Sequence, residues 1–299
     1  DPETREAAIH FCQERLATLP PAPGLPLARE PESLGQASFY RLHRRLPAER
    51  WKPIRETARG HGLTPSVVLL ATYAHVLSQW SAGAAHTLNL TLFERPDSHP
   101  DIARILGDFT ALAPISFDPA NQASLLSLAG QTQDRVAEVL EHRAVSSIWV
   151  QREQSHRIGL QAAALPVVFT STLGLADHFF DSTPEGFPDL ADGGLSETPQ
   201  VWLDYQVFEH RGELVISWDI AEDLFPEGMI ESMFNAYLHL LQQLADSEQA
   251  WTVPLPVRLP PEQQAMREAV NATEAPLLPR TLHLPVFEQA MARPSSAAL

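Results

Sequence analysis

Two stretches of the sequence place polar side chains among apolar ones, and both have the alternation of a β-strand. In PVVFTSTLG (166–174), Thr170 lies on the same strand face as Val168. In QVWLDYQVF (200–208), Asp204 shares a face with Trp202 and Gln206. A carboxylate in partly apolar surroundings is costly unless it is paired or used, and its pKa is expected to rise toward the range of a general acid. Thr170 and Asp204 are therefore the first candidates for catalytic residues.

Each of these side chains also has a purely structural interpretation. Threonine is a common strand residue, and Asp204 could cap a neighbouring strand or face solvent. Gln206 could orient either a substrate amide or Asp204 itself. In GDFTAL (107–112), Asp108 and Thr110 are expected to shape a turn, with Asp108 accepting hydrogen bonds from nearby backbone.

The spacing of histidine and serine disfavours two kinds of catalytic site. The 12 histidines include no HxxxH or HExxH pair, so we expect no metal site. Ser171, beside Thr170, has no Ser-His-Asp context, which argues against a serine hydrolase. The single cysteine, Cys12, lies on the apolar side of a predicted helix and is expected to be a small buried hydrophobe.

The helices and strands that must position these residues alternate along the chain. Apolar spacing predicts helices over 3–18, 47–60, 64–81, 123–142, 145–157 and 226–245. Alternation predicts strands over 37–46, 86–95, 109–117, 166–174, 200–210 and 213–220. The last two strands should form a hairpin at Arg211-Gly212. A loop of about 25 residues follows residue 174, and loops of that length are usually functional or mobile. This order of elements predicts an α/β layered domain.

Three of these elements have further features. The helix over 64–81 is apolar nearly all round and should be central. The strand over 86–95 alternates leucine with threonine and asparagine, which predicts one apolar face. The strand over 37–46 carries a basic cluster that we interpret as a solvated face, with contact to a phosphate left open. The members of this cluster are Arg41, His43, Arg44 and Arg45.

The composition limits the class of protein. A formal net charge of -16 over 299 residues argues against binding to nucleic acid or to anionic membranes, both of which need basic patches. One cysteine cannot form an internal disulfide or a cysteine-rich zinc site. The first residues are charged and lack a signal-peptide core, and no apolar run approaches the ~20 residues of a membrane helix. We therefore expect a cytoplasmic location and a sizeable core.

Six segments follow one another in the order seen in one protein family. They are LATLPPAPGLPL (16–27), TPSVVLLATYAHVLSQWS (64–81), LNLTLFERPDSHP (88–100), GDFTAL (107–112), PVVFTSTLG (166–174) and SETPQVWLDYQ (196–206). Together they resemble the heterocyclization domains of nonribosomal peptide synthetases, which are relatives of condensation domains. Any one of these motifs alone would be a weak signal, whereas six in order over most of the chain are specific.

The resemblance implies a chloramphenicol-acetyltransferase-like α/β two-layer sandwich, which is one lobe of the two-lobed condensation and cyclization fold. Heterocyclization domains carry DxxxxD in their N-terminal lobe, where condensation domains carry HHxxxDG, and this sequence has neither. We therefore expect 1–36 to be the end of the N-terminal lobe and the inter-lobe connection, and 37–250 to be the C-terminal lobe. The tail, 251–299, resembles a linker and the start of an adenylation domain, whose first helix typically reads LHxxFExQAxxxP.

The family joins a donor acyl group to an acceptor Cys, Ser or Thr and then closes a thiazoline or oxazoline ring with loss of water. Ring closure needs proton transfers that one positioned carboxylate can perform in turn, as general acid and base. A neighbouring hydroxyl can hydrogen-bond the tetrahedral oxygen. The resemblance assigns these two catalytic roles to Asp204 and Thr170. It implies substrate positioning by further residues, namely Gln206, Ser171, Trp202, Asp108 and Thr110.

By the same resemblance, the lobe binds no cofactor of its own, because both substrates are thioesters on the 4′-phosphopantetheine of carrier proteins. Its expected partners are the upstream and downstream peptidyl or aryl carrier proteins, the adjacent adenylation domain and the N-terminal lobe. The parent synthetase would make a siderophore or a peptide antibiotic.

Two alternative functions remain open. The chain could belong to a condensation-only domain that forms the amide without cyclising it, or it could be a non-catalytic lobe that only docks neighbouring domains. The motifs TPQVWLDYQ and GDFT favour cyclisation, and the presence of both Thr170 and Asp204 argues against a docking lobe. The fragment alone is expected to be inactive, because the substrate tunnel of this family runs between two lobes.

Overall fold

The computed structural model describes residues 2–35, 38–83, 85–93, 99–119, 122–145, 147–174, 194–255, 261–274, 281 and 283–296. The chain divides into two compact units, Asp1–Arg258 and Leu259–Leu299. Every candidate site residue belongs to the first unit. The long loop predicted after residue 174 lies mainly outside the described residues, which stop at 174 and resume at 194.

The described strands of the first unit form one six-stranded sheet. Its order is β1-β6-β5-β4-β2-β3. The strands are β1 (Phe39–Leu46), β2 (His86–Phe93), β3 (Thr110–Phe117), β4 (Val167–Ser171), β5 (Leu203–His210) and β6 (Glu213–Ala221). β4 runs parallel to both β2 and β5, whereas the other neighbouring pairs are antiparallel. The strands that carry Thr170 and Asp204 are therefore adjacent at the centre of the sheet.

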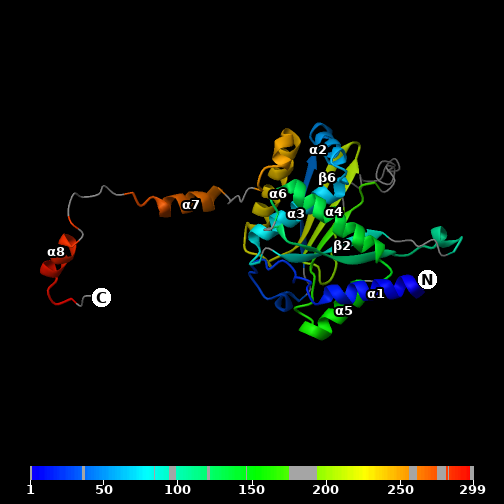
Figure 1. The fold of residues 1–299 in the computed structure, drawn as a ribbon, viewed down its shortest axis with the longest axis horizontal. Helices are drawn as coiled ribbons and strands as arrows, with labels where there is room; N and C mark the ends of the chain where they lie inside the picture. The colour runs from blue at the N-terminus through cyan, green and yellow to red at the C-terminus, as the bar shows by residue number, and fades with distance from the viewer. Residues whose placement is uncertain are drawn as a thin grey trace. The chain divides into compact units, whose positions relative to one another are not determined.

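Helices cover one face of this sheet. Figure 1 shows α2 (Ala48–Gly60), α3 (Pro65–Trp80), α4 (Leu125–Glu141) and α6 (Met229–Asp246) grouped on one side of the strands. α1 (Pro2–Leu16) packs beside α5 (Ser147–Ile158), and α5 packs against β3. The predicted α/β layered architecture is confirmed.

The core lies between the sheet and this helical layer. α3 is buried along most of its length, as its continuous apolar run predicts. The ring of Tyr73 on α3 has its centroid 5.0 Å from that of Tyr205 and 5.2 Å from that of Trp218. The Tyr205 and Tyr237 hydroxyl oxygens are 2.6 Å apart. Buried side chains of this size contribute on the order of 2 kcal/mol each, so this aromatic group fixes β5 and β6 against α3 and α6.

β2 is a strand with one apolar face, as predicted, but the polar positions of its other face are also buried. Its leucines face the core, but Thr87, Asn89 and Thr91 are buried as well. The Thr87 hydroxyl donates to the backbone oxygen of Pro20 at 2.6 Å, and the Asn89 amide donates to that of Leu165 at 2.9 Å. β2 is an inner strand, so its polar positions are covered by other parts of the chain and must find partners there.

The predicted hairpin between β5 and β6 is confirmed. His210 and Glu213 are cross-strand partners, and the two residues between them form the turn. Arg211 has φ 50 and Gly212 has φ 82. Two positive φ values are typical of the type I′ turn, whose twist matches that of the flanking strands.

The end of β4 and the helices of the second unit depart from the predictions. β4 ends at Ser171 instead of continuing to 174, although the Thr172 amide still donates to the Val207 oxygen at 3.0 Å. In the second unit, α7 (Pro261–Asn271) lies within a segment that was predicted to be linker, and α8 (Leu284–Ala292) covers part of the LHxxFExQAxxxP-like motif. No helix among the described residues combines the length and the apolar content needed to cross a membrane.

Candidate active site

Thr170, Asp204 and Gln206 lie on the sheet face opposite α3 and α6, because the side chains that alternate with them pack into the core. In the parallel pairing of β4 with β5, Val168 is opposite Asp204 and Thr170 is opposite Gln206. In the antiparallel pairing of β5 with β6, Asp204 is opposite Asp219. The register therefore places a hydroxyl, two carboxyls and an amide on neighbouring positions of three strands.

A polar network connects these side chains to β1. Arg41 donates from Nε to Asp219 Oδ1 at 2.5 Å and from Nη2 to Asp219 Oδ2 at 2.6 Å. The backbone N–H of Ser196 donates to Asp219 Oδ2 at 2.8 Å. The Gln206 amide donates to Asp204 Oδ2 at 2.9 Å and lies 3.4 Å from Asp219 Oδ2. Two carboxyls opposite each other would repel, and the guanidinium group compensates one of them.

Burial raises the pKa of Asp204, a residue that is only 7% exposed. The side chains of Gln206 and Ser196 oppose that rise in the pKa, the carboxylate of Asp219 adds to it, and the guanidinium group of Arg41 opposes it. Among the described residues, Asp204 Oδ2 has a hydrogen-bond donor, whereas the buried Oδ1 has none. A carboxyl with a raised pKa and one unoccupied oxygen is suited to hold a proton and release it.

Thr170 is half-buried at the end of β4, and its hydroxyl has one partner in the described part of the chain. Thr170 Oγ1 lies 2.8 Å from Oγ1 of Thr91 on β2, and either hydroxyl can be the donor. A hydroxyl offers one donor and two acceptor positions. Thr170 therefore keeps hydrogen-bonding capacity for another molecule while Thr91 restricts its orientation.

The structure does not gather all the predicted positioning residues around Asp204. Trp202 shares the face of Asp204 and is half-buried. Ser171 points to the opposite, helix-covered face, where its Oγ lies 2.8 Å from Oγ of Ser66 at the start of α3. This placement follows from strand alternation, because adjacent residues point to opposite faces.

Asp108 and Thr110 lie at the edge strand β3, two strands away from β4. Asp108 is exposed, and its Oδ1 accepts the backbone N–H of Thr110 at 2.8 Å. This bond matches the predicted turn, and hydrogen bonding to Thr110 lowers the pKa of Asp108. Thr110 opens β3 and pairs with Phe93.

The structure corrects the interpretation of the basic cluster on β1 as a solvated face. The Arg41 side chain is 21% exposed and is paired with Asp219, which is fully buried. Arg44, three residues along, is exposed and donates to the backbone oxygen of His43. Asp219 and Thr91 were not identified as site residues from the sequence. Their partners are separated from them by 178 and 79 residues, so only the strand register reveals them.

A groove of about 1040 Å3 lies next to the candidate site. Its walls come from the connection before β1, from α5 and from the segment that leads into β5, and they include Phe39, Ile148 and Trp202. Trp202 is two residues before Asp204 on the same strand face. The groove therefore offers apolar surface close to the buried carboxyl.

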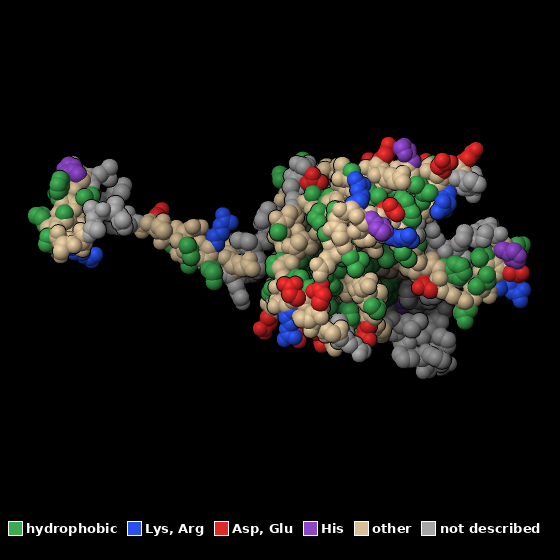
Figure 2. All heavy atoms as spheres, turned by 90° about the horizontal axis from the view of Figure 1, so that it is seen from below, with side chains coloured by type: hydrophobic (Ala, Val, Ile, Leu, Met, Phe, Trp, Pro, Cys, Tyr) green, Lys and Arg blue, Asp and Glu red, His purple; other side chains and the backbone are tan. Residues whose placement is uncertain are grey.

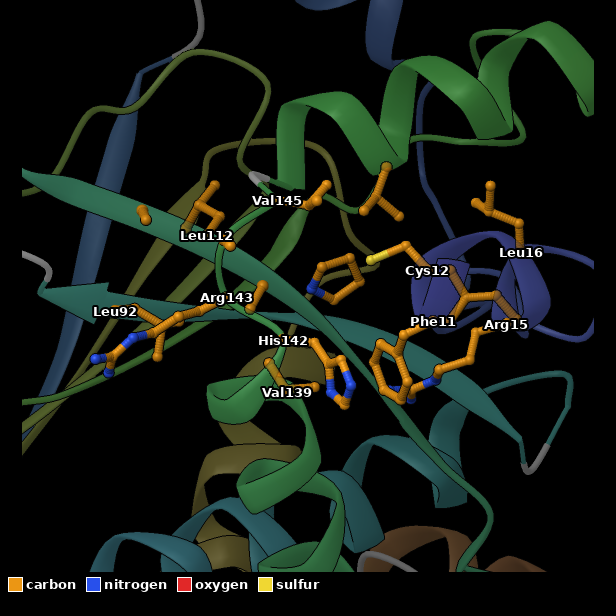
Figure 3. A pocket seen from close by; sticks show the side chains of 16 residues that line it. Phe11, Cys12, Arg15, Leu16, Leu92, Leu112, Val139, His142, Arg143 and Val145 are labelled. Atoms are coloured by element: carbon orange, nitrogen blue, oxygen red, sulfur yellow. The ribbon is translucent and has the colours of Figure 1, made fainter. Parts of the chain in front are cut away.

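A second, smaller cavity of about 200 Å3 lies between α1, β3 and the end of α4. Figure 3 shows Phe11 of α1 facing His142, and their ring centroids are 3.8 Å apart in a stacked arrangement. Cys12 lines this cavity and is half-buried, so the prediction of a buried cysteine is only partly correct. Burial raises the pKa of the Cys12 thiol. None of the predicted site residues lines this cavity.

Basic side chains are scattered on the face of the molecule that Figure 2 draws. On the face drawn in Figure 2, Lys and Arg side chains of the described residues lie singly among acidic and apolar ones. That face therefore presents no continuous basic surface to a polyanion such as nucleic acid.

Residues 3–252 match the family model of the condensation domain, and the chain belongs to this family. Its relatives include pyochelin synthetase PchE of Pseudomonas aeruginosa, which is 38% identical over 297 residues and matches 99% of this chain. Phenyloxazoline synthase MbtB of Mycobacterium tuberculosis is 35% identical over 295 residues, again 99% of this chain. The chain spans 20% and 21% of the lengths of these two proteins.

Solved structures support the same assignment. The nonribosomal peptide synthetase FmoA3, bound to α-methyl-L-serine-AMP, has a TM-score of 0.81 and 34% identity, covering 98% of this chain and 32% of its own. The EpoB cyclization-docking bidomain of Sorangium cellulosum has a TM-score of 0.70 and 32% identity, covering 84% of this chain and 50% of its own. The predicted fold, one lobe of the condensation and cyclization architecture, is confirmed. The predicted resemblance to heterocyclization domains is also confirmed.

Proposed function

We propose that this chain contributes half of a condensation and heterocyclization site, in which Asp204 and Thr170 act on ring closure. The substrates are a carrier-bound acyl group and a carrier-bound Cys, Ser or Thr. After the amide forms, the acceptor thiol or hydroxyl attacks the amide carbonyl carbon, and its proton passes to the carbonyl oxygen, which becomes a hydroxyl group. Loss of the former carbonyl oxygen as water then gives a thiazoline or oxazoline.

Asp204 serves as the general acid and base of the dehydration. Its protonated carboxyl delivers a proton to the departing oxygen, and the resulting carboxylate accepts the proton from the amide nitrogen. The two transfers balance, so Asp204 returns to its starting state after each ring closure. The raised pKa favours the protonated form that the first transfer needs.

Thr170 stabilises the tetrahedral intermediate by donating its hydroxyl hydrogen to the developing oxyanion. This role requires that Thr91 donate to Thr170, which leaves the Thr170 hydrogen free, or that the Thr170 hydroxyl rotate toward substrate. Both are open to a hydroxyl with one donor and two acceptor positions.

The observation that carries the proposal is the buried carboxyl of Asp204. It lies on the strand next to that of Thr170, because Asp204 is opposite Val168 and Thr170 is opposite Gln206. A buried carboxyl is costly to stability, and here one of its oxygens is left without a donor among the described residues. A purely structural aspartate would be expected to have both oxygens satisfied.

We further propose the wider arrangement of the parent synthetase. Residues 1–36 would end the N-terminal lobe, 37–250 would form the C-terminal lobe, and 251–299 would lead into an adenylation domain. Carrier proteins on both sides would deliver the substrates on 4′-phosphopantetheine, and the N-terminal lobe would complete the tunnel. The product class would be siderophores or peptide antibiotics, and a cytoplasmic location stays a prediction.

The decisive experiment is intact-mass analysis of carrier-bound intermediates on the full synthetase carrying Asp204→Ala. Cyclisation removes one water, a loss of about 18 Da, so condensed and cyclised products are separated directly. We expect the variant to accumulate the condensed, uncyclised product. Asp134→Ala, which removes an exposed aspartate on α4, is the matched control and should cyclise normally.

Two other outcomes would contradict the proposal. Normal cyclisation by Asp204→Ala would show that this carboxyl is structural. Loss of condensation as well as cyclisation, in a variant with an unchanged melting temperature, would favour a condensation-only role for this site.

A further inference from the structure

We propose that Arg41 and Asp219 form a positioning device that acts through the Gln206 amide to leave one oxygen of Asp204 without a hydrogen-bond donor, so that this oxygen carries the transferable proton. This inference rests on the proposed function of Asp204 and adds two residues to it. Neither residue touches the reacting atoms, so both are positioning residues and not catalytic ones.

The first part of the device is the ion pair itself. Arg41 holds both oxygens of Asp219 in a two-point contact at 2.5 and 2.6 Å. Asp219 is fully buried, and the Ser196 backbone N–H adds a third bond at 2.8 Å. A planar guanidinium group bound at two points has a fixed orientation, so the remaining N–H of Arg41 Nη2 points in a defined direction.

That direction determines how the Gln206 amide is turned. Arg41 Nη2 lies 3.4 Å from Gln206 Oε1, and arginine can only donate. The amide oxygen must therefore face Arg41, and the amide nitrogen must face the two carboxyls. Gln206 Nε2 then donates to Asp204 Oδ2 at 2.9 Å and lies 3.4 Å from Asp219 Oδ2.

The consequence falls on the two oxygens of Asp204. Oδ2 accepts a fixed N–H, so the proton of the neutral carboxyl is directed to Oδ1. Within the described residues, Oδ1 is buried and has no hydrogen-bond partner. The device thus separates the two oxygens into one that anchors the side chain and one that carries the transferable proton.

In the described part of the chain, the charged and titratable groups around Asp204 come from three elements, namely β6, β1 and α3. Asp219 on β6 and Arg41 on β1 lie on its own side of the sheet. Tyr73 of α3 lies within the core, and its pKa is raised well above the usual value by burial and by the charge of Asp204. Asp219 raises the pKa of Asp204 and Arg41 lowers it, so removal of the two members should act in opposite directions.

A purely structural ion pair is the competing explanation. Buried ion pairs often contribute little net stability, because desolvation offsets their attraction. A structural pair should affect folding and leave the pH dependence of catalysis in place. The positioning role predicts changes in both the rate and the pH dependence of ring closure.

The test measures ring closure on the full synthetase, as loss of water from the carrier-bound condensed product, over a range of pH. We expect Arg41→Gln and Asp219→Asn each to lower kcat for this step roughly 10- to 100-fold while KM stays within about 3-fold, because geometry and not binding is disturbed. The pH at which Asp204 loses its proton should rise in Arg41→Gln and fall in Asp219→Asn.

Two further variants guard against loss of folding. Arg41→Lys keeps the positive charge but loses the two-point contact. It should therefore lower kcat and leave the pH at which Asp204 loses its proton nearly unchanged. Arg44→Gln removes the same charge from an exposed position of β1 and should leave rate and pH profile unchanged. Melting temperatures of all variants identify any that do not fold. If Arg41→Gln or Asp219→Asn does not fold, the kcat of Arg41→Lys decides whether the two-point contact is needed for ring closure.

The reference variant Asp204→Asn separates the two proposals. If Asp204→Asn cyclises at the normal rate, the proposed function fails. If Asp204→Asn does not cyclise, the Arg41 and Asp219 variants that fold test the positioning proposal alone. That proposal is overturned if these variants retain the normal kcat. It is also overturned if both shift the pH at which Asp204 loses its proton in the same direction.

Discussion

At the scale of single residues, the candidate site contains two polar side chains at positions where apolar residues would stabilise the fold more. Asp204 is held in a buried position where its ionised form is disfavoured. Thr170 is oriented by one neighbour and keeps capacity for another bond. Both side chains replace the apolar residues that would pack best at the centre of a sheet, which is the pattern expected of a site retained for chemistry.

Removing the Thr170 hydroxyl should slow ring closure without preventing condensation. Thr170→Val keeps the shape of the side chain but has no hydrogen to donate to the oxyanion, and loss of such a donor costs about 10²- to 10³-fold in rate. Thr170→Ser should retain most of the activity. The ratio of condensed to cyclised carrier-bound product measures the effect.

Thr172→Val is the matched control, since Thr172 lies just beyond the end of β4 and is also half-buried. If Thr170→Val and Thr172→Val slow ring closure equally, the Thr170 hydroxyl has no specific role.

Neutralising Asp204 should stabilise the fold at neutral pH. A raised pKa means that the native state holds its proton more tightly than the unfolded state. Stability therefore falls as the pH rises from the unfolded pKa of about 4 through the raised folded value. Asp204→Asn removes this loss, so its melting temperature should exceed that of the wild type at pH 7.5. The two should converge near pH 4.

Thermal unfolding of Asp204→Asn and of Asp134→Asn at both pH values checks this expectation. Asp134 is exposed on α4, so its substitution should change neither value appreciably. A lower melting temperature for Asp204→Asn at pH 7.5 would show that the ionised carboxyl is well accommodated.

At the scale of elements, the site depends on how three strands are packed against the helical layer. β4, β5 and β6 each present core residues to α3 and α6 on one face and polar residues on the other. The aromatic contacts of Tyr73 with Tyr205 and Trp218 hold β5 and β6 at a fixed depth. A displacement of either strand would move Asp204 relative to Asp219, since the two are directly opposite in the register.

The helical layer can be tested with two leucines of the same helix. Leu128 of α4 is fully buried, whereas Leu140 is 37% exposed. Leu128→Ala should cost about 2–5 kcal/mol of unfolding free energy, because it removes buried methylene groups and leaves a cavity. Leu140→Ala should cost less than about 1 kcal/mol. Chemical denaturation of both variants measures the difference, and equal losses would contradict the described packing of α4.

At the scale of the whole molecule, the first unit contains the six described strands, the helices that pack on them and every candidate site residue. The 3-10 helix Glu248–Trp251 closes this unit, and its Trp251 is fully buried. The Trp251 indole N–H donates to the Leu244 oxygen at 3.1 Å, which ties the end of the unit to α6.

A chain that ends at Arg258 should therefore unfold at the same temperature as the 299-residue chain, within about 1 °C. A chain that ends at Asp246 should unfold at a clearly lower temperature, because it lacks the buried indole of Trp251. Thermal unfolding of the three chains distinguishes these cases. A lower melting temperature for the chain ending at Arg258 would place the boundary further along the sequence.

Much of the fold could be predicted from local patterns. Apolar periodicity located α3, α4 and α6, alternation located the strands, and Arg211-Gly212 located the hairpin, because each depends on residues close in sequence. α7 was missed because its segment was read as proline-rich linker. The burial of the polar positions of β2 was not predicted, because the segments that cover them are distant in the chain.

The sequence by itself determined which side chains could act, since the types and alternation around Thr170 and Asp204 place one hydroxyl and one carboxyl on strand faces. It also determined the family, through motifs in a specific order. Only the tertiary structure decided that β4 and β5 are neighbours, that Ser171 contacts Ser66 at the start of α3, and that Arg41 is paired with Asp219. These features depend on strand order and register. Both are set by packing between segments far apart in the chain, and no local pattern encodes them.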